Sequence, residues 1–331
     1  MTTKLIAVVG STGHQGKGVV AALLDSTDFK VRAVTTNPEG DKAKALAATH
    51  SDAISSGRLE LFKADLADEA STAAALSGAY GLFVAQVPGP QEEAQGKALV
   101  DAAKVAQVTH FVYSSLPSIG QLSEGRFVRV FPFEAKYKIE KYAREQLEHV
   151  TALIPGQVSE AGSNFHISFS DCGFYSNMSM PWYTKRGEDG IARFLDSTSP
   201  GATRKIQCLD DEVDVGRFAA AVFTRGAHST AGKTYPIAGP PLDTQEIAQI
   251  YERVTGETTR VEHVELDEVL SSLPPFVQPC MKEMFLWLEQ AHPHKLAYGA
   301  MEPQDDHSEE DLGVKASTFE EFLNRTGFRL Q

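Results

Sequence analysis

The chain is short of cysteine pairs, of long apolar runs and of basic charge. Its 331 residues include three isolated cysteines, and none of them stands in a C-x-x-C pair. This pattern indicates neither a disulfide framework nor a zinc site, so we expect no bound metal. No apolar stretch approaches the length that spans a bilayer, and Met1 to Lys4 leads directly into an apolar segment. We therefore expect a cytoplasmic protein without a secretory signal or a membrane role.

Basic residues are outnumbered by acidic ones, 31 to 44, which gives a formal net charge of −13. Nucleic acid and anionic membrane surfaces attract the opposite sign, so neither is expected as a partner. The hydrophobic fraction of 42% is enough for a sizeable core. The length fits one large α/β domain with a smaller lobe, or two domains.

The most informative segment is a glycine-rich turn between an apolar run at 4–9 and an amphipathic run at 17–24. Strand, glycine turn and helix is the arrangement that binds the pyrophosphate of a dinucleotide. In this arrangement Gly10 allows the tight turn, Gly13 lets the backbone approach the phosphates, and Gly16 lets the helix pack closely on the strand. The spacing is G-x-x-G-x-x-G, and an ordinary glycine-rich turn is the alternative.

Predicted strands and helices alternate along the first half of the chain. The strands are predicted at 4–9, 29–34, 59–64, 81–85 and 110–114. The helices are predicted at 17–24, 41–49, 68–76, 91–106 and 134–150. Such alternation is typical of βαβ units and a parallel sheet. The predicted fold class is therefore α/β: a Rossmann-type, doubly wound parallel sheet with a smaller C-terminal substrate lobe.

The second half is less regular. Strands are predicted at 165–170, 205–209 and 233–238, and helices at 211–223 and 243–255 and after a capping box at 317–320. We expect residues 1–174 to form the NAD(P)-binding domain, with sheet contributions from about 205–240. Residues 175–331 are expected to form mainly the substrate-binding lobe.

Ligands of an open α/β sheet bind at the carboxyl ends of the strands. The expected cofactor contacts are therefore the turn residues Gly10, Thr12, Gly13, His14, Gln15 and Gly16, together with Thr36, Asn37, Asp65, Leu66, Ala85, Gln86 and Val87 after strands two to four. Asp65 serves equally well as a cap for the next helix.

No carboxylate stands at 34–38, the end of the second strand, where an NAD-specific site places one to bind the ribose 2′-hydroxyl. Thr36 and Asn37 can hydrogen-bond a 2′-phosphate there, and Lys42 can supply charge. This favours NADP as the cofactor and leaves NAD open. A plain turn at 36–38 is the alternative interpretation of the same residues.

The helix after strand five contains Tyr137 and Lys141 at the Y-x-x-x-K spacing of short-chain dehydrogenases. Its apolar stripe, taken at about 100° per residue, consists of Ile139, Ala143, Leu147 and Val150. Tyr137 and Lys141 lie roughly opposite this stripe, whereas Lys136 lies within about 30° of its centre. We therefore expect Lys136 to point inward, toward a cofactor ribose or a reacting oxygen. The alternative is a lysine that extends to water.

Ser114 and Ser115, which follow strand five, place two hydroxyls in the predicted cleft. Either can orient a substrate oxygen, and either can simply cap the backbone. We take Lys136 and Ser115 as the candidate catalytic residues, with Lys136 also contacting the cofactor.

These motifs together resemble the NmrA-like family, which are atypical relatives of the short-chain dehydrogenases/reductases. The matching segments, spread over nearly the whole chain, are 9–16, 35–38, 113–116, 133–136, 139–142, 173–177 and 214–216. The resemblance implies that the lysine matching Lys136 is retained and that the tyrosine of the usual pair is lost. Pro132 stands four residues before Lys136, where that tyrosine would be. Many NADP-binding members have arginine where this chain has Thr36.

The resemblance implies two kinds of function. Some relatives are NADPH-dependent reductases of quinones or plant phenolics, whereas others are redox sensors that control a partner protein. The aromatic and methionine side chains between 174 and 183 suggest a pocket for a flat, hydrophobic substrate, with core packing as the alternative. The predicted function is an NAD(P)H-dependent oxidoreductase of a small hydrophobic carbonyl, quinone or aromatic compound. A non-catalytic sensor with a regulatory protein partner is the competing hypothesis. The segment 147–164 is expected to be a long link near the substrate entrance, with a tolerated surface insertion as the alternative.

Overall fold

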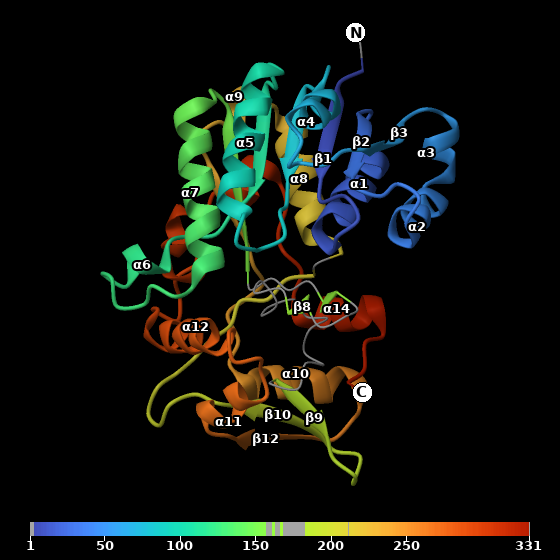
Figure 1. Ribbon diagram of the computed structural model, residues 1–331. Helices are drawn as coiled ribbons and strands as arrows, with labels where there is room; N and C mark the ends of the chain where they lie inside the picture. The colour runs from blue at the N-terminus through green and yellow to red at the C-terminus, as the bar shows by residue number, and fades with distance from the viewer. Residues whose placement is uncertain (1–2, 157–160, 163–165, 168–182, 211, 331) are drawn as a thin grey trace.

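A computed structural model describes residues 3–156, 161–162, 166–167, 183–210 and 212–330 (Figure 1). Its main sheet has seven parallel strands in the order β11-β6-β5-β4-β1-β2-β3. The strands are β1 (Leu5–Val9), β2 (Lys30–Thr35), β3 (Leu59–Lys63), β4 (Gly81–Val84), β5 (His110–Ser114), β6 (Val150–Pro155) and β11 (Thr234–Ile237). The strand order reverses between β1 and β4, and such a switch point places the ligand crevice at the carboxyl ends of these two strands. The predicted Rossmann-type fold is confirmed.

Helices cover both faces of this sheet. One face carries α4 (Glu69–Leu76), α5 (Glu92–Val105) and α7 (Phe131–Gln146); the other carries α1 (His14–Ser26) and α8 (Asp214–Arg225). The flanking helices are α2 (Asp41–Thr49), α3 (Ser51–Ser55), α6 (Ile119–Leu122) and α9 (Ala227–Thr230). Glycines let α1 and α8 cross closely, because a Cβ on Gly216 would stand 2.2 Å from the Gly18 carbonyl oxygen.

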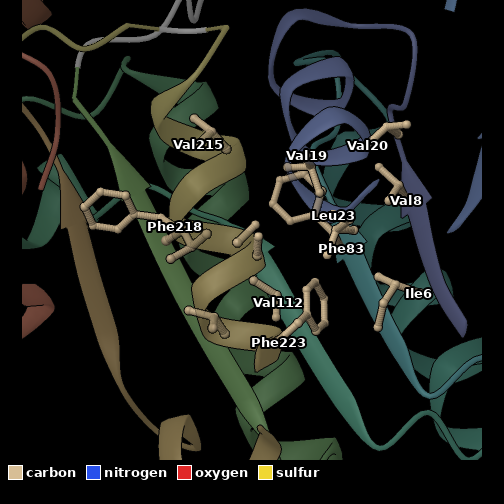
Figure 2. Close-up of a cluster of buried hydrophobic side chains, with 14 of the residues drawn as sticks. Ile6, Val8, Val19, Val20, Leu23, Phe83, Val112, Val215, Phe218 and Phe223 are labelled. Atoms are coloured by element: carbon tan, nitrogen blue, oxygen red, sulfur yellow. The ribbon is translucent and has the colours of Figure 1, made fainter. Parts of the chain in front are cut away.

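The core under α1 and α8 is filled by interlocking apolar side chains. Figure 2 shows Leu23 of α1 and Phe223 of α8 directed at the strands, beside Phe83 of β4. The ring of Phe223 occupies the space above Gly81, where a Cβ would lie 2.6 Å from the ring carbon Cε1. This close packing holds β4, and with it the loop that follows β4, at a fixed distance from β1.

A smaller lobe lies beyond the carboxyl edge of the sheet (Figure 1). It contains a three-stranded sheet in the order β12 (Thr259–His263), β10 (Ala192–Asp196), β9 (Thr184–Arg186), and a short hairpin of β7 (Ala161–Gly162) and β8 (His166–Ile167). The helices of this half are α10 (Thr244–Thr255), α11 (Leu266–Ser271), α12 (Gln278–Gln290), η2 (Ala297–Gly299), η3 (Pro303–Asp305), α13 (Ser308–Leu312) and α14 (Phe319–Thr326).

Polar contacts attach the C-terminal helix α14 to the start of α8. The buried carboxylate of Asp214 accepts hydrogen bonds from the backbone N–H and the hydroxyl of Ser317, and Arg325 makes two 2.8 Å bonds to Asp210. Burial raises the pKa of Asp214 above its ordinary value, and the hydrogen bonds from the Asp210 N–H and from Ser317 oppose that rise. Asp214, which belongs to one of the family-like motifs, thus has a structural role in this fold.

Two predictions beyond β5 are wrong. The helix after β5 ends at Gln146, and Val150–Pro155 forms the buried strand β6, so the expected long link at 147–164 begins with a central strand. The run Val-Thr-Ala-Leu-Ile lacks alternation because both faces of a parallel strand are covered. Segment 205–209 makes isolated bridges at Ile206, whose partner is Leu242, and at Leu209, while β11 pairs with β6. The strand predicted at 165–170 is present in its described residues, His166–Ile167, which form β8 and pair in the hairpin with β7.

The remaining predicted elements agree with the structure to within a few residues. Within the described ranges, no helix combines the length and the apolar character needed to cross a membrane.

Candidate functional site

The glycine turn connects β1 to α1 and is shaped by its own backbone contacts. Gly10 has a φ of +81°, which favours glycine, and a Cβ there would lie 2.2 Å from the Ala85 carbonyl oxygen. The turn closes with a 2.9 Å hydrogen bond from the Gly13 N–H to the Gly10 carbonyl. A Cβ on Gly16 would lie 2.1 Å from that same carbonyl oxygen. Gly10 and Gly16 are therefore required to bring α1 and β4 close to the end of β1.

The N-terminus of α1 offers an anion site at the end of this turn. Gly13 is the N-cap residue and provides no side-chain cap, and the first turn of α1 contains no acidic residue. The first N–H groups of a helix lack intrahelical partners, and the helix dipole favours negative charge beside them. The buried hydroxyl of Ser11 donates a 2.8 Å bond to the Val34 carbonyl and so fixes the turn to β2. The arrangement suits a pyrophosphate.

Two serines follow each other at the carboxyl end of β5, and they differ in their contacts. The Ser114 hydroxyl donates a 2.6 Å hydrogen bond to the Gln15 Oε1, so it is occupied within the protein. The Ser115 side chain is fully buried, and its Oγ has no hydrogen-bond partner among the described residues. A buried hydroxyl without a partner is unusual and calls for a functional or solvent explanation.

Lys136 points inward from the first half of α7, as the helical phase predicts. Only 5% of the residue is exposed. Its Nζ donates a 2.9 Å bond to the Gln86 carbonyl and forms a 2.6 Å ion pair with the Glu92 Oε1. Lys141 is exposed, and the half-buried Tyr137 bonds to Gln121 near the surface. The structure therefore brings Lys136, and neither member of the Y-x-x-x-K pair, to the loop after β4.

Tyr113 contributes a second buried polar group on the same face of the sheet. Its hydroxyl has no described hydrogen-bond partner, and its ring stacks on Phe111 at a centroid distance of 6.0 Å. Burial raises the pKa of Tyr113 well above its ordinary value, and the negative charges of Glu92 and Glu140 raise it further. The phenol therefore stays protonated, and its ring packs in the core beside Phe111.

The residues expected at the adenosine end are more exposed. Thr36 and Asn37 both lie at the surface, and the Asn37 Oδ1 accepts a 3.2 Å bond from the Glu39 N–H. The turn predicted as an alternative at 36–38 is thus present. This hydrogen bond uses the Asn37 side-chain oxygen and does not involve its N–H₂ donors. Asp65 is exposed and accepts from the Ala67 N–H at 2.9 Å.

The cap of α4 is Asp68, so the alternative role of Asp65 as helix cap is wrong. Leu66 is half-buried beside this turn, and Val87, after β4, is 63% exposed.

A cavity of about 670 Å³ adjoins the glycine turn on the outer side of α1. Its lining includes Thr12 and His14 from the turn, and the amine-bearing side chains of Lys17 and Lys42. These two cations can supply charge to an additional phosphate, and the carboxylates of Asp25 and Glu212 line the same cavity. Among the described residues, no group of three His, Cys, Asp or Glu side chains is arranged to hold a metal ion.

Sequence reasoning missed three residues of this site: Ser11, Lys17 and Glu92. Glu92 and Glu93 open α5, and acidic residues at a helix start are expected from the helix dipole alone. Helical phase could have found Glu92, because it lies on the buried stripe of α5 with Gly96, Leu99 and Ala103, whereas Glu93 lies off that stripe. Of the aromatic segment expected to line a substrate pocket, residues 174–182 lie outside the described part. Tyr183 is buried in the core of the smaller lobe.

The model of the NmrA-like family matches residues 2–323 of this chain. The chain belongs to the NmrA-like family. Two curated relatives carry the description NmrA-like family domain-containing oxidoreductase. FrzB of Cladobotryum sp is 31% identical over 275 residues, which is 79% of this chain and 76% of FrzB. The protein hkm9 of Aspergillus hancockii is 39% identical over 158 residues, so the match spans 45% of this chain and less than half, 44%, of hkm9.

Solved structures of the same fold include NmrA, described as a negative transcriptional regulator, in complex with NADP. It has 21% identity and a TM-score of 0.74 over 98% of this chain and 96% of NmrA. The NADPH-dependent quinone oxidoreductase QOR2 of Escherichia coli, complexed with NADPH, has 20% identity and a TM-score of 0.70 over 98% of this chain and the whole of QOR2. At these identities the likeness establishes the NmrA-like fold.

Proposed function

We propose that this protein is an NADP(H)-dependent reductase of a small hydrophobic carbonyl, quinone or aromatic compound. The observation that carries the proposal is the inward, charged Lys136, held by the loop after β4 at the carboxyl edge of the sheet. A lysine ammonium in this position lies beside the crevice that the strand order creates between β1 and β4. The oxidoreductase description of the family relatives agrees with it.

The described residues fit a nicotinamide dinucleotide. The pyrophosphate would lie on the uncapped start of α1, over Gly13, while Gly10 and Gly16 let the turn, α1 and β4 pack closely around it. The adenosine end would lie near Thr36, Asn37, Asp65 and Leu66, and the nicotinamide end near Ala85, Gln86 and Val87. Lys17 and Lys42 line the cavity beside the turn and would supply charge to a 2′-phosphate, which supports NADP over NAD.

The chemistry that a reduced nicotinamide supplies when bound is a hydride. The residues of this protein would position the acceptor and protonate it. Lys136 would hold the nicotinamide ribose through one N–H or donate a proton to the product oxygen. Ser115 would accept or donate a hydrogen bond at the end of β5, where its hydroxyl has no described partner. Neither role requires Tyr137, which bonds to Gln121.

A screen of quinones, enones and aromatic carbonyls tests the activity, with loss of the reduced-nicotinamide absorbance as the readout. We expect oxidation of NADPH with at least one acceptor of this class. Tight dinucleotide binding with no oxidation of NADPH by any acceptor would contradict the proposal. Partner binding that depends on the redox state of the cofactor would then identify the protein as a sensor.

Two lysine variants test the assignment within α7. Lys136→Met should lower kcat by a factor on the order of 100 or more, the range seen when a proton-transferring group is removed. Lys141→Met is the matched control, because it removes an exposed lysine from the same helix, and it should leave kcat within about twofold. Equal losses at both positions, in variants that remain folded by thermal melting, would contradict the role of Lys136.

A further inference from the structure

Glu92 is the most buried carboxylate around the proposed site, and it has one described side-chain contact. Its side chain is 1% exposed, and its Oε1 lies 2.6 Å from the Lys136 Nζ. The other oxygen, Oε2, is buried and has no partner in the described part of the chain. Glu92 does not cap a helix either, since Gln91 is the N-cap residue of α5 and no side-chain cap bond is present there. The carboxylate therefore serves Lys136.

Stability alone does not explain such a pair. Removing both charges from water costs more than their attraction commonly returns, and apolar side chains of similar size often replace a buried ion pair without loss. The helix dipole at the start of α5 favours the negative charge of Glu92 and offsets part of this cost. A charged pair retained in a dry position points to a use for the charge or for the fixed geometry.

The contacts of Lys136 indicate that use. An ammonium has three N–H donors, and two of them are directed to the Gln86 carbonyl and to Glu92. The third N–H has no partner among the described residues. Two anchors from the segment after β4 restrict the long, flexible lysine side chain to one orientation. The conformational entropy of the lysine side chain is thus lost when the protein folds, so ligand binding does not carry that cost.

We infer that Glu92 is a positioning residue, which holds the Lys136 ammonium so that its remaining N–H meets the nicotinamide ribose or the product oxygen. The inference rests on the proposed function. It assigns to Glu92 no contact with the cofactor or the substrate; its whole effect passes through Lys136.

A double-mutant cycle tests this dependence. Glu92→Gln keeps the size of the side chain and removes its charge, while Lys136→Met removes the ammonium. In the wild-type background, Glu92→Gln should weaken NADPH binding by about fivefold or more and lower kcat by roughly 10- to 100-fold, the effect of misplacing a catalytic group by about 1 Å. The KM for the acceptor should change by less than about twofold. In the Lys136→Met background, Glu92→Gln should have no further effect on either quantity.

Thermal stability separates positioning from a structural role. Glu92→Gln leaves a buried ammonium without its counter-charge, so the melting temperature should fall; Glu92→Gln/Lys136→Met removes both charges, so it should recover. Activity should not recover with it. If activity and NADPH affinity instead fall in Glu92→Gln and recover in the double variant, as the melting temperature does, Glu92 is structural and the inference is wrong. If Glu92→Gln does not fold, Glu92→Asp replaces it in the cycle. This variant keeps the charge but shortens the side chain by one methylene, so the carboxylate moves away from Lys136.

Glu93 provides a matched control in the same helical turn. It pairs with Lys97 at 2.7 Å and with Lys138 of α7 at 3.1 Å, but its side chain is 35% exposed. Glu93→Gln should change NADPH affinity and kcat by less than about twofold, since exposed pairs contribute little.

Calorimetric titration keeps the two proposals distinguishable. If the wild-type protein reduces no acceptor, the proposed function fails, and Glu92 is judged by NADPH affinity alone. A loss of affinity on Glu92→Gln in the wild-type but not in the Lys136→Met background supports the inference. Equal losses in both backgrounds, or none in either, overturn it.

Discussion

Ser114 and Gln15 join the two ends of the proposed site. The Ser114 hydroxyl, at the end of β5, donates a 2.6 Å hydrogen bond to the side-chain oxygen of Gln15, in the first turn of α1. Both residues are buried, at 2% and 7% exposure, and they lie 99 positions apart in the sequence. The bond fixes the distance between the phosphate-binding turn and the edge where Lys136 and Ser115 lie.

Ser114→Ala should therefore lower the free energy of unfolding by about 1–2 kcal/mol, because it leaves the buried Gln15 oxygen without its donor. The loosened turn should also weaken NADPH binding severalfold. Chemical denaturation measures the first effect and calorimetric titration the second. An unchanged unfolding free energy would show that the Gln15 oxygen finds another donor.

Ser115→Ala is the matched comparison one residue further along. The Ser115 hydroxyl makes no described hydrogen bond, so its removal should change the unfolding free energy by less than about 0.5 kcal/mol. If Ser115 orients the substrate, kcat should nevertheless fall by about tenfold. A variant as unstable as Ser114→Ala would contradict the structural difference between the two serines, and an unchanged kcat would remove Ser115 from the proposed mechanism.

Substitutions at two glycines of the turn should affect folding and dinucleotide binding differently. Gly10→Ala forces a side chain into a backbone with φ of +81° and against the Ala85 carbonyl, so it should destabilise the fold by about 3 kcal/mol or more. Gly13 has φ −83° and ψ 173°, an extended conformation that any residue adopts. Gly13→Val should keep the fold to within about 1 kcal/mol and abolish dinucleotide binding, because its side chain occupies the space that the pyrophosphate needs.

Thermal melting and titration with NADPH together check this pair. Retained binding in Gly13→Val would place the pyrophosphate elsewhere. A fully stable Gly10→Ala would mean that the loop after β4 can move away from the turn.

NADPH should bind more tightly than NADH by a factor on the order of ten, about 1.4 kcal/mol. The end of β2 has no carboxylate at 34–38, and Lys42 lines the adjoining cavity, but no arginine is placed there for a bidentate phosphate contact. Lys42→Met should reduce this ratio, whereas Lys44→Met, which removes an exposed lysine paired with Glu39 at 3.7 Å, should not. Tighter binding of NADH in calorimetry would mean that a carboxylate elsewhere binds the 2′-hydroxyl.

The strands that form the cofactor half of the sheet could be predicted because each is a short apolar run with a turn after it. The inward direction of Lys136 could be predicted for a similar reason: helical phase depends only on the 3.6-residue period and on the apolar stripe of Ile139 and Ala143, both fully buried. Such local signals require no knowledge of what lies opposite.

The rest of the site depends on long-range contacts that leave no local pattern. Glu92 lies 44 positions before Lys136, and although its phase places it on the buried face of α5, no local pattern indicates that Lys136 is its partner. Strand β6 was not predicted because only three residues, 147–149, separate it from α7. The apolar residues of the strand then continue the helical pattern of α7 without a visible break. The small sheet of β9, β10 and β12 has strands of three to five residues with charged side chains such as Arg193, and these resemble loops.

His110 predicts how the stability of the fold depends on pH. It is fully buried at the start of β5, and its Nε2 lies 3.2 Å from the Thr151 hydroxyl and 3.1 Å from that of Thr230. Burial, with smaller contributions from the charges of His149 and Lys4, lowers the pKa of His110 to about 3. The folded protein therefore keeps this ring neutral at pH values where the unfolded chain, with an ordinary histidine pKa, binds a proton.

Because the unfolded state binds the extra proton, stability is lost as the pH falls below about 6.5 and continues to be lost down to about pH 3. From about pH 7 to about pH 5, His110 alone should cost roughly 2 kcal/mol of unfolding free energy. His110→Gln keeps a side chain that can bond to the threonine hydroxyls but does not titrate, so its stability should fall by that much less over the same interval. Urea unfolding of both proteins at the two pH values measures the difference. Identical pH dependence in both would mean that the ring is protonated in the folded state, and that its pKa is not lowered by burial as we infer.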